Sequence, residues 1–110
     1  MRKLSEKDIR ILMKLAPEAE KKSKIEYRSI LPPVSMYYAV DEDDFEARLE
    51  RLSSDDLNYL AAHILDGSEC LLCISPEYAG IFIRFLERNG TGNEAERIKE
   101  LYESSTGYKV

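Results

Sequence analysis

A phrase that starts helices occurs three times in the chain, as LSEKDI from Leu4, VDEDDF from Val40 and LSSDDL from Leu52. In each copy an apolar residue precedes Ser or Asp, an acid follows three positions later, and a second apolar residue comes next. The first polar side chain accepts a hydrogen bond from a backbone N–H that the first helical turn leaves unpaired. The acid reaches back to the N–H of the capping residue, and the two apolar residues pack together. The phrase therefore predicts helices that begin near residues 6, 42 and 54.

Apolar residues recur with helical spacing after these starts, and two more starts follow at Ser75-Pro76 and near Asn93. Together these signals predict helices over residues 6–16, 42–51, 54–66, 76–89 and 94–104. The chain of 110 residues, 44% of them hydrophobic, is the size of one domain and is able to bury a core. We therefore expect a single compact all-α domain over residues 1–110, with five to six short helices in a bundle or an orthogonal array. The tail, 104–110, is expected to fray.

Two stretches give weaker signals. Residues 18–30 are predicted to form a further helix with a thin apolar face, which ends at Leu31-Pro32-Pro33 because proline disfavours a helical residue before it. The apolar residues 34–40 are predicted to form either a buried extended link or a short helix. Their two tyrosines, Tyr37 and Tyr38, either fill the core or contribute to a partner-binding surface, since tyrosine is enriched at interfaces.

The charge distribution is uneven. Residues 1–30 hold nine Lys or Arg against five acids, whereas residues 31–110 hold seven against sixteen, and the whole chain has a net charge of −5. Either the two parts attract each other within the fold, or the N-terminal third contacts an anionic partner. No apolar run approaches the roughly 18–20 residues of a membrane span, and charges interrupt the N-terminus. We therefore expect no membrane partner and a cytoplasmic location.

Cys70 and Cys73 form a C-x-x-C spacing, which occurs in zinc sites and in thiol–disulfide enzymes. A zinc site needs at least three protein ligands, and the chain adds only one histidine, His63. The leucines and isoleucine around the two cysteines favour protonated, shielded thiols. We therefore predict that both thiols are mostly buried, unbridged and without metal, and that His63 lies on a helix surface with no catalytic partner. The acidic run 41–44 lacks the glycine and glutamate of a calcium loop and is interpreted as helix capping.

The basic segment with Lys21, Lys22, Lys24 and Arg28 is the candidate nucleic-acid contact. Three glutamates interrupt or flank it, and the chain as a whole is acidic, so a solvated helix surface is the preferred interpretation. No pattern for catalysis or cofactor binding is found. The sequence thus favours a non-enzymatic protein-interaction or regulatory module that binds another protein or its own copy. The alternatives are a nucleic-acid-associated regulator that uses residues 21–28, and a thiol or metal protein that uses residues 70–73.

Overall fold

The computed structural model of the chain describes residues 4–21, 27–89 and 92–110. In chain order its elements are α1 (Glu6–Leu15), η1 (Pro17–Lys21), α2 (Leu31–Pro33), η2 (Val34–Tyr38), α3 (Glu42–Leu49), α4 (Ser54–Leu65), α5 (Pro76–Arg88) and α6 (Gly92–Thr106). η1 is a turn of 3-10 helix and η2 a turn of π-helix. The described residues contain no strand, which confirms the predicted all-α fold.

The capping chemistry predicted for α1 and α4 is present. The amide of Asp8 donates to Ser5 Oγ at 3.1 Å, and the Ser5 amide donates to Asp8 Oδ2 at 2.8 Å. The same reciprocal pair joins Ser53 and Asp56 at the start of α4. Both acids are buried, so each cap closes a helix end that faces the interior.

The start of α3 departs from the predicted pattern. Asp41 caps the helix as expected, because its Oδ1 accepts from the Asp44 amide at 2.8 Å. The Asp44 carboxylate, however, accepts from the amide of Val40, not from that of Asp41. The Val40 side chain is 85% exposed whereas Phe45 is fully buried. The predicted apolar clasp between Val40 and Phe45 is therefore wrong, and Val40 faces solvent.

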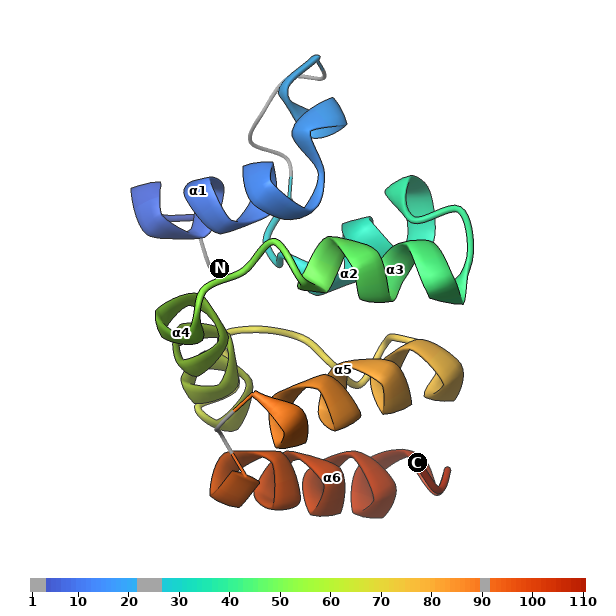
Figure 1. The fold of residues 1–110 in the computed structure, drawn as a ribbon. Coiled ribbons are helices and arrows are strands. Elements are labelled where there is room, and N and C mark those ends of the chain that lie inside the picture. Colours follow the sequence, from blue (N-terminus) through green and yellow to red (C-terminus); the bar gives the residue numbers. More distant parts are fainter. Residues whose placement is uncertain (1–3, 22–26, 90–91) are drawn as a thin grey trace.

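The helices form an orthogonal array (Figure 1). α5 packs between α3 and α6, α1 contacts α3, and α4 crosses the ends of this stack and contacts α6. The Cα radius of gyration is 12.9 Å, and a single compact domain of this length is expected to have about 13 Å. The largest fully buried side chains come from all parts of the array, and they include Tyr102, Phe45, Phe82, Ile11, Leu12, Leu15, Ile30 and Leu31.

The second predicted helix is wrong in extent. η1 ends at Lys21, and residues 27–30 are not helical, while 22–26 lie outside the described residues. The two prolines start a helix instead of ending one, because α2 begins at Leu31 with both prolines in its first turns. The amides of a first turn have no acceptor within the helix, so proline loses nothing there. Residues 34–38 continue as η2, which confirms the short-helix alternative for this stretch.

The tail is held against α6. Gly107 ends the helix with a φ of +82°, a left-handed conformation that suits glycine. The Val110 amide then donates to Glu103 Oε2 at 3.0 Å, and the Val110 side chain packs on the core. Fraying of residues 104–110 is a dynamic property and stays a prediction.

Candidate functional site

Three large apolar side chains are exposed within five residues of each other. Met36 and Tyr37 lie on η2 and are 62% and 67% exposed, and Val40 follows at 85%. Val34, on the same short helix, is fully buried and anchors the segment to the core. Three large apolar residues within five positions, all facing solvent, are a candidate interaction site. We call Met36, Tyr37, Val40 and the adjoining acids 41–43 the apolar–acidic surface.

The acids of this surface are exposed at the start of α3. Asp41, Glu42 and Asp43 all face solvent. Residues 29–47 contain no Lys or Arg, so this segment supplies no cation of its own. The surface therefore combines apolar side chains with negative charge. It is complementary to a ligand that combines an apolar group with positive charge.

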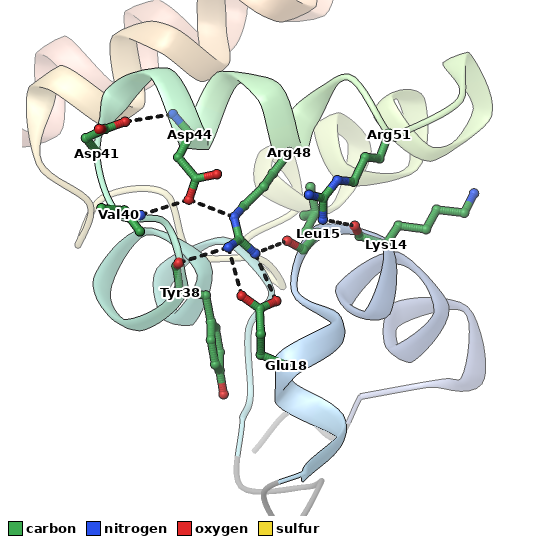
Figure 2. A network of polar contacts seen from close by, with 9 residues as sticks. All are labelled: Lys14, Leu15, Glu18, Tyr38, Val40, Asp41, Asp44, Arg48 and Arg51. Carbon is green, nitrogen blue, oxygen red and sulfur yellow. Dashed lines mark hydrogen bonds and ion pairs between the residues drawn. The ribbon is translucent and has the colours of Figure 1, made fainter.

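One buried arginine holds this segment in place (Figure 2). Arg48, on α3, is only 7% exposed. Its Nη1 donates to the Leu15 carbonyl at 2.8 Å and to Glu18 Oε1 at 3.0 Å. Its Nη2 donates to Glu18 Oε2 at 2.8 Å and to the Tyr38 carbonyl at 3.0 Å, and its Nε donates to Asp44 Oδ2 at 3.1 Å. A guanidinium has five N–H donors, and each of them has an acceptor here.

The acceptors explain what the arginine does. The carbonyls of Leu15 and Tyr38 lie at the last residues of α1 and η2, where helical carbonyls lack partners and a positive charge is favourable. The side-chain hydrogen bond from Arg48 is the main cause that lowers the pKa of Glu18 below 4.5. The amide of Val40 and then Arg48 lower the pKa of Asp44 below 3.8. Both carboxylates therefore stay charged around a cation that fixes the end of η2.

The other end of the segment is held by Glu69. This buried carboxylate accepts from the Ile30 amide at 2.9 and 3.1 Å and from the Leu31 amide at 3.1 Å. These amides stand at the start of α2, so a residue far along the chain caps this helix. Sequence reasoning considered Glu69 only in relation to the cysteines, as a nearby charge or a possible metal ligand, and missed this role. Nothing in the local pattern marks it, because the donors are 38 and 39 positions away.

The two predicted interface tyrosines have different environments. Tyr37 is exposed and is available to a partner. Tyr38 is half-buried, and its ring packs edge-on against Tyr27 while the two hydroxyls are 2.7 Å apart. Tyr38 therefore packs against Tyr27 and is not one of the exposed side chains of the apolar–acidic surface. Met36 and Val40, which sequence reasoning did not select, take the exposed places instead.

The C-x-x-C pair lies on a turn. Cys70 is half-buried and Cys73 is exposed, and both are free. The prediction that both thiols are mostly buried is therefore wrong for Cys73. The Ile74 amide donates to the Leu71 carbonyl at 3.1 Å, and this turn directs Leu71 and Ile74 inward and leaves Cys73 outside.

Partial burial, and then a hydrogen bond that the protonated Cys73 thiol makes to Cys70, raise the pKa of the Cys73 thiol to about 11. The protonated thiol is a weak nucleophile and a weak metal ligand near neutral pH. Among the described residues, no group of three or more His, Cys, Asp or Glu side chains is arranged to hold a metal ion. The thiol and metal alternative stays a prediction.

His63 belongs to a polar cluster between α1 and α4. Its ring stacks on Tyr59 with the centroids 4.1 Å apart, and its Nδ1 lies 2.8 Å from the Tyr59 carbonyl oxygen. The Tyr59 hydroxyl donates to Asp8 Oδ1 at 3.0 Å, and Lys7 Nζ lies 4.8 Å from the centre of the Tyr59 ring. The carboxylate of this cluster is thus bonded to the tyrosine and not to the imidazole. The cluster joins two helices and does not have the geometry of an acid–base pair.

The basic segment is described only in part. Lys21 closes η1, Arg28 is exposed, and Lys22 and Lys24 lie outside the described residues. Contact between these cations and a nucleic acid stays a prediction.

Two general findings bear on function. No helix in the described ranges is both long and apolar enough to span a membrane. Comparisons with known proteins find no matching protein family, curated protein or solved structure for this chain.

Proposed function

We propose that this domain is a non-enzymatic protein-interaction module, and that the apolar–acidic surface is its binding site. The proposal rests on the exposure of Met36, Tyr37 and Val40 within one short anchored segment. Removing such side chains from water on binding is favourable by about 25 cal/mol per Å² of apolar area. Tyrosine and methionine are also enriched in the centres of protein interfaces.

The anchoring favours binding over a role as a loose loop. Glu69 fixes the start of α2, and Arg48 fixes the end of η2 through the Tyr38 carbonyl. A surface that is already ordered loses less conformational entropy when a partner binds. The exposed side chains therefore stand on a rigid support, as interface anchors do.

The charge of the surface defines the partner. Asp41, Glu42 and Asp43 follow Val40 directly in the chain and are exposed, so they add negative charge to this segment. We infer a protein segment that inserts a large apolar side chain and places Lys or Arg beside it. A symmetric dimer through this surface is disfavoured, because it would bring the acids of both copies into one interface, where like charges repel. A partner other than a second copy is therefore the better fit.

A selection from random linear peptides tests the proposal. We expect the immobilised domain to enrich peptides with an aromatic or large aliphatic residue next to Lys or Arg. These peptides should bind the Tyr37→Ser variant about tenfold or more weakly, as is typical when an interface hot spot is truncated. Their binding should also weaken as salt is raised, because exposed charges are screened.

Leu101→Ser is the control, because Leu101 is an exposed apolar residue on α6, which α5 separates from α3. The control should bind the selected peptides like the wild type. Peptides that bind both variants equally, an enrichment of acidic peptides, or no enrichment at all would each contradict the proposal. Circular dichroism of the variants checks that the fold is unchanged.

A further inference from the structure

A cleft of about 330 Å³ lies between the end of α4, the residues that follow it, and α6. Its size is at the lower end of the range of about 300–1,000 Å³ typical of small-molecule sites. The walls are mostly aliphatic and include Leu65, Leu72 and Leu101, the last two of which are themselves exposed. The cleft thus offers an apolar surface that a small ligand is able to remove from water.

The charged groups that line the cleft are all negative. They are the carboxylates of Asp66 and Glu69, and no Lys or Arg among the described residues lines the cleft. α4 also ends here at Leu65, with Asp66 as its C-terminal cap, and the C-terminal end of a helix carries partial negative charge. The two carboxylates and the end of α4 all make the electrostatic potential in the cleft more negative, so the cleft favours a cation over an anion.

We propose that the cleft binds a small apolar amine, with the aliphatic or aromatic body between α4 and α6 and the ammonium group at Asp66. Glu69 is buried and holds the amides of Ile30 and Leu31, so it contributes charge but is not the contact. Asp66 is exposed at the end of α4, where an ammonium group remains partly hydrated. This keeps the cost of removing the cation from water low.

Three ligands of equal chain length separate the charge from the apolar contribution: octylamine, octanol and octanoate. Each is titrated into the labelled protein, and backbone amide shifts are followed by NMR. We expect the shifts to map to residues 64–72 and 98–102, with octylamine binding most tightly, octanol less tightly and octanoate least. Asp66→Asn keeps an oxygen that accepts from Ser68, as Asp66 Oδ1 does at 2.8 Å from the amide.

This variant should reduce the preference for octylamine over octanol by about two- to fivefold, the effect of one exposed charge at a helix end. Asp55→Asn removes an exposed charge at the other end of α4 and should leave the preference unchanged. Leu101→Lys places a cation at the rim and should abolish octylamine binding. Octanoate that binds as well as octylamine, or shifts outside the cleft, would overturn the proposal. Cleft amides that shift with protein concentration alone would also overturn it, because a second copy would then occupy the cleft.

Discussion

Replacing Arg48 with methionine is the sharpest test of how the apolar–acidic surface is supported. Methionine keeps a long unbranched side chain and removes all five donors. The buried Leu15 carbonyl then loses the side-chain donor that the structure provides. The Tyr38 carbonyl loses its bond to a cation, and the carboxylates of Glu18 and Asp44 lose their ion pairs. The substitution therefore removes the polar contacts by which Arg48 joins α1, η1 and η2 to α3, and it leaves the hydrogen bond from Arg51 to the Lys14 carbonyl in place.

The cost follows from these losses. A buried carbonyl left without a donor costs about 1–3 kcal/mol, and a lost hydrogen bond to a charged group costs about 1.5–3 kcal/mol. Glu18 and Asp44 are partly exposed, so they regain water, and the loss of their ion pairs adds little to this cost. We expect the free energy of unfolding to fall by about 3–5 kcal/mol, which is also the typical cost of breaking a buried ion pair. A domain of this size has only about 5–15 kcal/mol in total.

Urea unfolding followed by far-UV circular dichroism measures this difference. If the free energy of unfolding falls with urea concentration at the same slope in the variant and the wild type, their folded and unfolded states are comparable. Arg88→Met is the matched control, because Arg88 pairs with Glu46 at 3.7 Å on the exposed surface. The control should lose less than about 1 kcal/mol. Arg48→Lys should lie near Arg48→Met, because an ammonium group is too compact to reach acceptors on four elements.

If the free energy of unfolding of Arg48→Met lies within about 1 kcal/mol of the wild-type value, which is the range of an exposed ion pair, Arg48 is not a buried anchor of the fold. Equal destabilisation of Arg88→Met and Arg48→Met would contradict the anchoring role as well. A loss of stability in Arg48→Met without weaker binding of the selected peptides would separate the two roles. The arginine would then stabilise the fold but not the binding surface.

Two further changes test the cap and the thiol. Glu69→Ala leaves the first amides of α2 without this acceptor and should lower the free energy of unfolding in urea by about 2–5 kcal/mol. Glu69→Gln keeps one acceptor and should lower it less. Equal stability of both variants and the wild type would contradict the capping role. The folded-state pKa of Cys73 is about 11 against 9.0 for an ordinary thiol. Between these values the unfolded chain loses the proton while the folded chain keeps it, so this thiol lowers stability as pH rises through that window. Iodoacetamide labelling of Cys73, read by mass spectrometry, should rise towards pH 11 in the folded protein and level off near pH 9 in urea, and identical profiles would contradict the shift.

Two physical causes underlie the differences from the sequence predictions. The sequence pattern predicted a helix over 18–30 that two prolines end, yet the prolines begin α2, where the Glu69 carboxylate accepts the first amides. The pattern also assigned Cys73 to the interior from its apolar neighbours, but the turn at 71–74 buries Leu71 and Ile74 and exposes Leu72 and the thiol. A group far along the chain decided the first outcome, and the direction of a local turn decided the second.

Local chemistry alone determined much of this protein. Caps such as Ser5 and Ser53, and apolar spacing after them, act within a few residues, so the sequence is enough to place α1, α3, α4, α5 and α6 and the all-α class. The tertiary structure alone decided which apolar residues stay exposed and which charges are buried. Arg48 meets Leu15 across 33 positions and Glu69 meets Ile30 across 39, and no local pattern encodes such pairs. Burial makes these contacts strong, and burial is a property of the packed chain.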